Sequence, residues 1–388
     1  MPADPVKASR IQALDGARGL ALFGILILNI GGFALPRAAY MNPAYAGMPS
    51  FSDGAVWTIL NVAAQGSFLA AFALLFGAGL ELLHRRGSFW NLSRLCWLAM
   101  LGFVHGVWLW EGDILLTYAL VGIGGVLVMR ASSTVRGLLS TGVVLFAIGL
   151  LLLFWMGTLM AGVTSADWTP TATDIAREAA WKLAGGEAAR GQRLSMTLSV
   201  LLSVFLQYGW QLLGLMLIGA ALMRNGWLKG EWSTAVYRRQ GWFWLLASLA
   251  IKAFAVALQW RFEWDLAVSG YYLQVVKEVG SVLQGLAYLA LWFGYGQSAG
   301  MARVRSLLSQ VGRMTLSNYL LQTLVCTTLF YHFGGYRHFD RLTLLAFVPA
   351  VWGVNLLFSL IWLRYFRQGP LEWLWRKLTD AVVQRRGA

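Results

Sequence analysis

Long hydrophobic runs separated by short charged stretches dominate the pattern of the chain. A helix rises about 1.5 Å per residue, so roughly twenty apolar residues cross the hydrocarbon layer of a bilayer. The pattern therefore predicts an all-α polytopic membrane protein with about ten transmembrane helices. The expected spans are 13–35, 55–83, 94–110, 113–130, 136–162, 197–223, 240–260, 271–298, 311–331 and 341–364.

We expect these spans to form a single transmembrane domain over 1–388. Its first part, 13–162, holds spans one to five. Its last part, 197–388, holds spans six to ten and an amphipathic tail. The intervening stretch, 163–196, is expected to be an extracytoplasmic loop.

Two stretches outside the spans have the spacing of amphipathic helices that lie on a membrane surface. Residues 173–183 form either a plain surface helix or a lid over an outward-facing site. Residues 369–379 include Pro370, which suits the first turn of a helix. Trp373 and Trp375 suit the aromatic belt of a membrane interface.

Composition and charge point the same way. Of 388 residues, 58% are hydrophobic and 12% are charged, and the mean hydropathy of +0.60 lies outside the range of soluble domains. Of the 31 Lys and Arg residues, twenty fall on one side of the predicted spans and eight on the other. The positive-inside rule then predicts that both termini are cytoplasmic. The formal charge of +14 reflects this asymmetry, and we expect no nucleic-acid partner.

The first span carries an unusual set of polar residues. Asp15 and Arg18 are i, i+3 neighbours on one helix face. They either neutralise each other and fix the depth of the helix, or Arg18 is a fixed positive charge at the cytoplasmic mouth of a site. Asn29 lies about three turns deeper, roughly 16 Å further along the helix. An amide at that depth needs a partner, so this face is expected to point into the protein.

The stretch richest in reactive groups runs from His105 to Asp113. A His within a span can act as a general base that nearby carboxylates tune. His105 and Glu111 point to different helix faces, so a contact needs Asp113 to fold back past Gly112 or a carboxylate from another span. No two of the four histidines have the spacing of metal ligands on a helix, so no metal site is expected.

Polar residues recur at helical spacing in several later spans, where burial makes them expensive. They either join helices by hydrogen bonds or line a hydrated or ligand-filled interior. They are Gln207 and Gln211 in span six, Lys252 and Gln259 in span seven, Gln274, Lys277, Glu278, Ser281 and Gln284 in span eight, Asn318 and Gln322 in span nine, and Asn355 in span ten.

The first-span motif resembles the signature of the transmembrane acyltransferases. The pattern is Asp15-Gly-x-Arg18, a small and apolar run, and a polar residue eleven positions after the Arg. That superfamily includes bacterial sugar O-acetylating enzymes and the lysosomal heparan-glucosaminide acetyltransferase. The bacterial sugar enzymes commonly have His at the last position, whereas this chain has Asn29, as the lysosomal enzyme does. Since an amide does not exchange protons near neutral pH, the general base must lie elsewhere.

Three further stretches, 105–115, 312–322 and 367–376, resemble the YeiB family of bacterial inner-membrane proteins, and the likeness extends over essentially the whole chain. The placement of that family in the acyltransferase superfamily implies transfer of an acetyl group from cytosolic acetyl-CoA to an acceptor across the membrane. The acceptor would be a hydroxyl or amine, such as that of a sugar or glycolipid. Membrane lipid is an implied partner, and a homodimer is compatible with the sequence.

The resemblance assigns roles to the polar residues. Arg18 is the leading candidate to bind the phosphates of acetyl-CoA because the motif places it. Other candidates are Arg85, Arg86, Arg94, Arg238, Arg239, Arg303, Arg305 and Arg313, which alternatively only follow the topology rule. His105 is the expected base because it is the one histidine predicted within a span, with Asp113 beside it and Asn29 binding a carbonyl. Expected contacts of the acceptor are Glu111, Gln207, Gln211, Asn318 and Gln322.

Two other classes of protein stay open. A transporter would use the polar interior as a substrate path and Lys252, Lys277 and Glu278 as coupling charges. The sequence shows no clear inverted repeat or paired broken helices, which makes this class less favoured. The third class is a receptor or assembly factor without catalytic activity.

Overall fold

The computed structural model describes the backbone of residues 5–132 and 134–387, and side chains over 12–132 and 134–384. Helices make up the regular structure throughout these residues. The α-helices are α1 (Pro5–Ala34), α2 (Ala38–Met41), α3 (Phe51–Ala63), α4 (Ser67–Leu82), α5 (Ser88–Val104), α6 (Leu115–Ala131), α7 (Val135–Leu159), α8 (Ala172–Ala184), α9 (Gly186–Ser203), α10 (Gly209–Arg224), α11 (Thr234–Arg261), α12 (Leu273–Tyr295), α13 (Ala302–Arg313), α14 (Thr315–Thr327), α15 (Arg341–Tyr365) and α16 (Pro370–Gly387). Short π-helical segments are η2 (His105–Leu109), η3 (Val204–Tyr208), η4 (Leu266–Tyr272) and η6 (Thr328–His332), and 3₁₀ turns are η1 (His84–Arg86) and η5 (Ala299–Met301).

The prediction of an all-α polytopic membrane protein is confirmed. Within the described residues, seven helical stretches are long and apolar enough to cross a membrane: 12–34, 51–82, 88–109, 135–159, 186–224, 234–261 and 341–365. Leu151 on α7 and Phe243 and Leu246 on α11 are more than 60% exposed, as expected of side chains that face lipid. The other three expected spans correspond to the shorter α6, to the polar α12, and to α14 with η6 and the last residues of α13. That these also cross the membrane stays a prediction.

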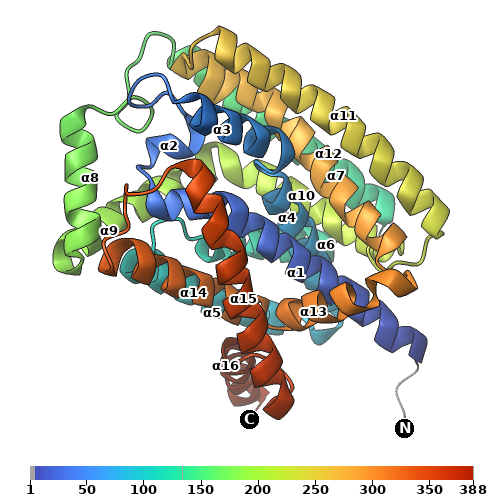
Figure 1. The fold of residues 1–388 in the computed structure, drawn as a ribbon. Coiled ribbons are helices and arrows are strands. Elements are labelled where there is room, and N and C mark those ends of the chain that lie inside the picture. Colours follow the sequence, from blue (N-terminus) through green and yellow to red (C-terminus); the bar gives the residue numbers. More distant parts are fainter. Residues whose placement is uncertain (1–4, 133, 388) are drawn as a thin grey trace.

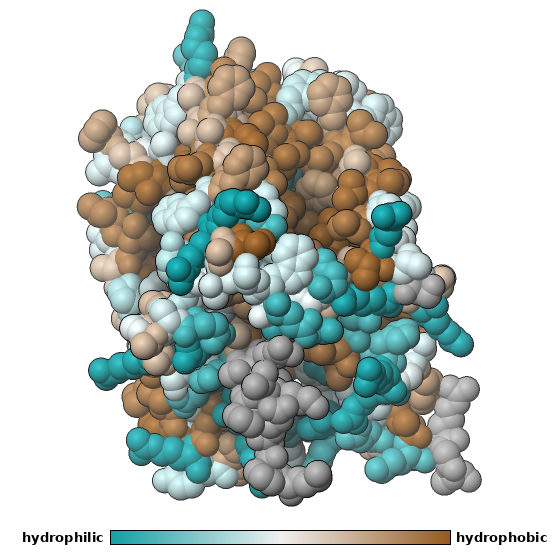
Figure 2. Space-filling view, turned by 90° about the vertical axis from the view of Figure 1, so that its right-hand side faces the viewer, coloured by the Kyte–Doolittle hydropathy of each residue, from teal (hydrophilic) through white to brown (hydrophobic). Residues whose placement is uncertain are grey.

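The helices form one bundle (Figure 1). α11 packs along α12, α10 along both α7 and α4, α1 along α13, and α5 along α6. We call the end of the bundle where α1 begins and α16 packs on α5 the terminal end, and the opposite end, which carries α8, the α8 end (Figure 1). Figure 2 shows the face where α1 begins, with hydrophilic side chains gathered in its lower half and hydrophobic ones in its upper half.

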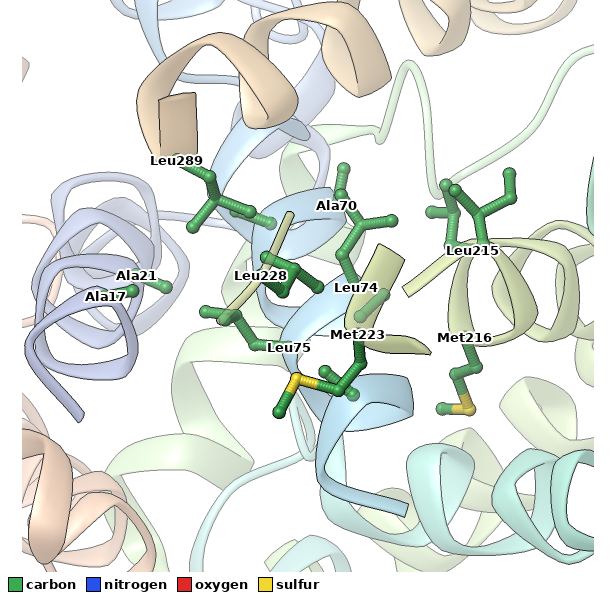
Figure 3. Packing of buried hydrophobic residues seen from close by; sticks show 14 of the residues in the cluster. Ala17, Ala21, Ala70, Leu74, Leu75, Leu215, Met216, Met223, Leu228 and Leu289 are labelled. Atoms are coloured by element: carbon green, nitrogen blue, oxygen red, sulfur yellow. The ribbon is translucent and has the colours of Figure 1, made fainter. Parts of the chain in front are cut away.

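Small residues let α1 approach its neighbours closely. Ala17 and Ala21 of α1 join a large apolar core with side chains of α4, α10 and α12 (Figure 3). On another face of α1, a Cβ on Gly312 of α13 would collide with the carbonyl oxygen of Asp15. Glycine there therefore permits backbone contact between α13 and the polar start of the first span.

Span two is broken, which corrects the prediction of one continuous helix over 55–83. α3 ends at Ala63 and α4 begins at Ser67. Gly66 between them has φ +74°, in the left-handed region that favours glycine. The break leaves backbone carbonyls without helical partners inside the bundle.

Side chains from two other helices satisfy these carbonyls. Lys252 Nζ of α11 donates to Gln65 O at 2.7 Å and to Gln284 Oε1 of α12 at 2.7 Å. Ser281 Oγ also donates to Gln65 O at 2.9 Å, and Gln284 Nε2 donates to Val62 O at 3.1 Å. In an apolar environment each free backbone group needs such a partner. Part of the polar stripe of span eight therefore stabilises a broken helix, a role that hydropathy does not reveal.

Two other boundaries differ from the sequence expectation. α9 begins at Gly186, so the sixth pass starts before 197 and takes in the end of the expected loop 163–196. Within the expected ninth span, 311–331, the helix is interrupted at Met314, between the end of α13 and the start of α14. Two of the expected spans are therefore interrupted in the structure, where the sequence showed no clear sign of broken helices.

Candidate functional site

A cavity of about 500 Å³ lies at the terminal end, between α1, α4, α5, α6, α14 and α16. Its interior is mainly apolar, with Leu22 and Ile25 of α1 facing Phe72, Phe76 and Leu115. Its charged rim includes exposed residues, so the cavity reaches the surface of the molecule. An apolar pocket with a few convergent polar groups is the usual form of a ligand site.

The charged rim is strongly basic. Two carboxylates line it, and both are engaged: Asp15 pairs with Arg18 at 3.0 Å, and Glu372 binds the start of α14. The guanidinium of Arg94 stacks on Trp375, 3.8 Å from the ring centroid. The five arginines of the rim are Arg18, Arg94, Arg313, Arg367 and Arg376. This excess of positive charge favours an anionic ligand.

α16 forms a wall of the cavity. Glu372 Oε1 accepts hydrogen bonds from the backbone N–H groups of Leu316, at 2.7 Å, and Ser317, at 3.1 Å. A carboxylate in this position caps the first turn of α14 and complements its dipole. Burial raises the pKa of Glu372, and the hydrogen bonds to Ser317 and Leu316 oppose that shift. The tail helix is thus anchored to the bundle.

The two tryptophans of the tail differ in their surroundings. Trp373 is 46% exposed, which is compatible with the expected interfacial position. Trp375 instead lines the cavity and donates from Nε1 to Arg94 O at 2.7 Å. The sequence pattern alone did not distinguish them.

α1 presents its motif along one face. Asp15, Arg18, Leu22 and Ile25 all line the cavity. Asn29 continues this stripe about 6 Å beyond Ile25. It does not line the cavity, and its half-buried amide has no hydrogen-bond partner among the described side chains and backbone. A ligand group just past the inner end of the cavity could supply one.

The inner end of the cavity is closed by Ile114, Tyr118 and Tyr319. Tyr319 Oη accepts a hydrogen bond from Ile114 N at 3.3 Å. Its ring centroid lies 5.2 Å from that of His105. The tyrosine therefore separates the cavity from the histidine that the sequence singled out.

His105 and Asp113 form a buried pair directly behind this wall. His105 Nδ1 lies 2.7 Å from Asp113 Oδ1, and Nε2 lies 2.9 Å from Thr323 Oγ1 of α14. Asp113 Oδ2 accepts from Leu116 N at 2.8 Å, which fixes the carboxylate. Asp113 thus folds back past Gly112, one of the two routes to a carboxylate that the sequence allowed. His105 itself opens the π-helical segment η2, a local widening often found at functional sites.

Glu111 has different partners. Its side chain pairs with Lys182 of α8, at 2.9 Å, and with Arg193 of α9, at 3.4 Å. Lys182 is fully buried and also pairs with Glu178 at 2.8 Å. Burial disfavours the charge on Glu111, but Lys182 and Arg193 outweigh it and lower the pKa of the carboxyl. Glu111 therefore attaches α8 and α9 to the turn that carries Asp113.

The remaining expected contacts of the acceptor join helices away from the cavity. Gln207 donates to Gly149 O of α7 at 2.9 Å, and Gln211 packs at the same place. Asn318 donates to Ser359 Oγ of α15 at 2.8 Å, and Gln322 donates to Asn355 at 3.0 Å. The helix-joining interpretation fits these contacts. Their expected role in binding an acceptor has no support from this geometry.

The expected phosphate-binding arginines divide into two groups. Arg18, Arg94 and Arg313 line the cavity. The other six lie outside its lining and are Arg85, Arg86, Arg238, Arg239, Arg303 and Arg305. These six are compatible with the simpler explanation that they follow the topology rule.

Sequence reasoning did not single out four residues of the region. Arg367 and Arg376 delimit the tail stretch that carried the family resemblance, which was the available signal. Tyr319 lies within another such stretch. Thr323 follows it by one turn and carries no signal of its own, since its partner His105 is 218 residues away in the sequence.

Comparison with known proteins places the chain in a family. Residues 222–381 match a family model described as "Protein of unknown function (DUF418)". The chain is 49% identical to the uncharacterized protein YeiB of Escherichia coli (strain K12), over 95% of this chain and 96% of the relative. It is 29% identical to the uncharacterized protein YxaH of Bacillus subtilis (strain 168), over 95% and 94% of the two chains. No solved structure matches it. Because the likeness to YeiB covers nearly the whole of both proteins, the chain belongs to the YeiB family of DUF418 proteins.

Proposed function

We propose that the protein is a membrane acyltransferase that moves an acetyl group from acetyl-CoA to a hydroxyl or amine acceptor. One observation carries the proposal: a cavity with a basic rim ends one side chain away from a buried His–Asp pair. The rim suits the phosphates of the donor, and the pair suits proton transfer from the acceptor.

The fit of acetyl-CoA rests on the rim and the interior together. Five arginines and two carboxylates line the rim, and both carboxylates already have partners. Positive charge is therefore in excess and can bind phosphates. Apolar walls beyond the rim suit a flexible thioester arm. Asn29 extends the same face of α1, where its amide would hydrogen-bond the thioester carbonyl.

The second part of the fit is the base. An ionised carboxylate only accepts hydrogen bonds, so Asp113 holds the proton of His105 on Nδ1 and leaves Nε2 as the basic nitrogen. A base of this kind removes the proton of the acceptor as its oxygen or nitrogen attacks the acyl carbonyl.

The proposal includes an orientation. The charge asymmetry supports a bacterial inner-membrane protein with cytoplasmic termini and ten spans, in which the terminal end faces the cytosol. The donor would then enter from the cytosol. The acceptor, such as a sugar or glycolipid, would approach from the α8 end.

Acetyl-CoA binding by the purified protein in lipid nanodiscs tests the donor site. Each charge-assisted contact to phosphate is worth about 1.5–3 kcal/mol, so Arg18→Ala should weaken binding roughly tenfold or more. Arg239→Ala is the matched control, because that arginine is exposed outside the cavity and should leave the affinity unchanged. Equal affinity of wild type and a well-folded Arg18→Ala variant, measured by calorimetry, would refute the assignment. Salt titration is a weaker test because it screens every exposed arginine.

Interruptions in two of the expected spans, at Gly66 and at Met314, keep a transporter as the second candidate, since broken helices often surround transport sites. Lys277 Nζ has Gln259 Oε1 at 3.4 Å, a contact loose enough to change during a transport cycle. Lys252, by contrast, is held by carbonyl and amide oxygens at the break. Failure of acetyl-CoA to bind would favour this second candidate.

A further inference from the structure

The basic nitrogen of His105 faces a hydroxyl group that does not line the cavity. Thr323 Oγ1 lies 2.9 Å from His105 Nε2, and Asp113 Oδ1 lies 2.7 Å from Nδ1. All three side chains are buried. A hydroxyl, an imidazole and a carboxylate in this order form the arrangement that activates serine and threonine nucleophiles.

A buried threonine in a helix ordinarily bonds its hydroxyl to the carbonyl one turn earlier. Thr327 does so, with Oγ1 donating to Thr323 O at 2.8 Å. In Thr323 the corresponding distance to Tyr319 O is 3.5 Å, which is much longer than its distance to the imidazole. The two threonines share one helix, and of the two only Thr323 has the imidazole of His105 within hydrogen-bond distance. The hydroxyl of Thr323 is directed at the base.

We infer that Thr323 is a nucleophile that carries the acyl group between donor and acceptor; this rests on the proposed function. In the first step Thr323 Oγ attacks the thioester carbonyl, its proton passes to His105 Nε2, and the C–S bond breaks. The leaving sulfur takes that proton and departs as a thiol. In the second step the acceptor attacks the threonine ester and gives its proton to His105. The C–Oγ bond then breaks, and Oγ recovers the proton.

The location of Thr323 fits a two-step transfer. It lies one helical turn beyond Tyr319, the side chain that closes the donor cavity. From the other side, Thr197 Oγ1 of α9 and Cβ of Asp113 both lie next to Gly106. An acyl group held on Thr323 would be passed on without donor and acceptor meeting in one space. The first step requires the ring of Tyr319 to swing aside.

The test is to trap the acyl-enzyme. Purified protein in nanodiscs is incubated with radiolabelled acetyl-CoA in the absence of acceptor, denatured, digested and mapped by mass spectrometry. We expect one acetyl group at position 323 in the wild type and in Thr323→Ser. We expect none in Thr323→Val, which lacks the hydroxyl. Thr327→Val is the matched control, a buried threonine on the same helix, and should label as the wild type does. Acetyl-CoA affinity is measured in parallel for each protein.

The outcomes separate the two levels of the proposal. Wild-type protein that binds acetyl-CoA but acquires no covalent acetyl group would overturn the role of Thr323 and leave direct transfer standing. Label that persists in Thr323→Val, or that maps to another residue, would also overturn it. Absence of acetyl-CoA binding would refute the proposed function together with this inference.

Discussion

Glu111 and Asp113 lie two residues apart in one turn, yet their carboxylates serve different partners. Asp113 contacts His105 inside the bundle, whereas Glu111 pairs with Lys182 of α8. Gly112 between them leaves room for the ring of Trp110, with which a Cβ at this position would collide. At the scale of single residues, the type of side chain therefore does not reveal its role. The direction in which each side chain leaves the turn decides which partner it contacts.

Replacement of His105 tests the role of the base. We expect His105→Ala to lower acetyl transfer by about 10²–10⁴-fold while acetyl-CoA binding is retained, because a positioned base acts on the reaction step. His338→Ala is the control, since that histidine is exposed. Asn29→Ala should also impair transfer, but the pH dependence of the remaining activity should persist. Transfer at the wild-type rate in His105→Ala would exclude the histidine as the base.

At the scale of elements, the break between α3 and α4 depends on side chains from two other helices. Lys252→Met should lower the stability of the protein, because it removes one of the two side-chain donors to Gln65 O and one of the two donors to Gln284 Oε1. A hydrogen bond to a charged group contributes about 1.5–3 kcal/mol. Thermal unfolding in nanodiscs measures this loss. The acetyl-CoA affinity of the folded variant should not change, since Lys252 lies outside the cavity lining. A loss of acetyl-CoA affinity in a variant of normal stability would contradict this account.

α8 provides the pH-dependent element. Burial disfavours charge on both Lys182 and Glu111, but their attraction wins, so the pKa of Lys182 is raised and the pKa of Glu111 is lowered. The contribution of Lys182 is complete below its ordinary value of 10.5 and is lost as pH rises through the raised pKa. The contribution of Glu111 is complete above its ordinary value of 4.5 and is lost as pH falls through the lowered pKa.

We therefore expect α8 to stay docked between about pH 4.5 and pH 10.5 and to loosen only beyond these limits. Hydrogen exchange of the α8 amides, corrected for intrinsic rates, measures the docking. Lys182→Met should raise the exchange of α8 already at neutral pH, because it removes the cation that pairs with both Glu111 and Glu178. Glu187→Gln is the control, since that carboxylate is exposed. Exchange of α8 that rises sharply near pH 7 in the wild type would be inconsistent with these ion pairs.

At the scale of the whole molecule, the prediction concerns topology. Ser165, in the loop before α8, and Ser233, at the start of α11, should lie on opposite sides of the membrane if ten spans and cytoplasmic termini hold. Single cysteines at these positions, in a background lacking Cys96 and Cys326, are labelled in intact cells with a membrane-impermeant reagent. We expect reaction at position 165 before lysis and at position 233 only afterwards. Labelling of both from outside would invalidate the assigned topology.

Much of this protein follows from its sequence alone. Apolar run length predicts the helices and the membrane environment, because the free energy of transfer to lipid is a local property of each segment. Helical periodicity places Asp15, Arg18 and Asn29 on one face, since 3.6 residues per turn fixes that relation whatever surrounds the helix. The sequence also allowed Asp113 to reach His105 by folding back past Gly112.

The tertiary structure decided the features that depend on partners far apart in the chain. The break at Gly66 is stabilised by Lys252 and Gln284, and α16, which forms a wall of the cavity, is anchored where Glu372 caps α14. The hydroxyl at the basic nitrogen of His105 comes from a helix more than two hundred residues later. Such contacts arise from the way whole helices pack, and packing depends on the simultaneous fit of many side chains. Local hydropathy and periodicity carry no information about that fit.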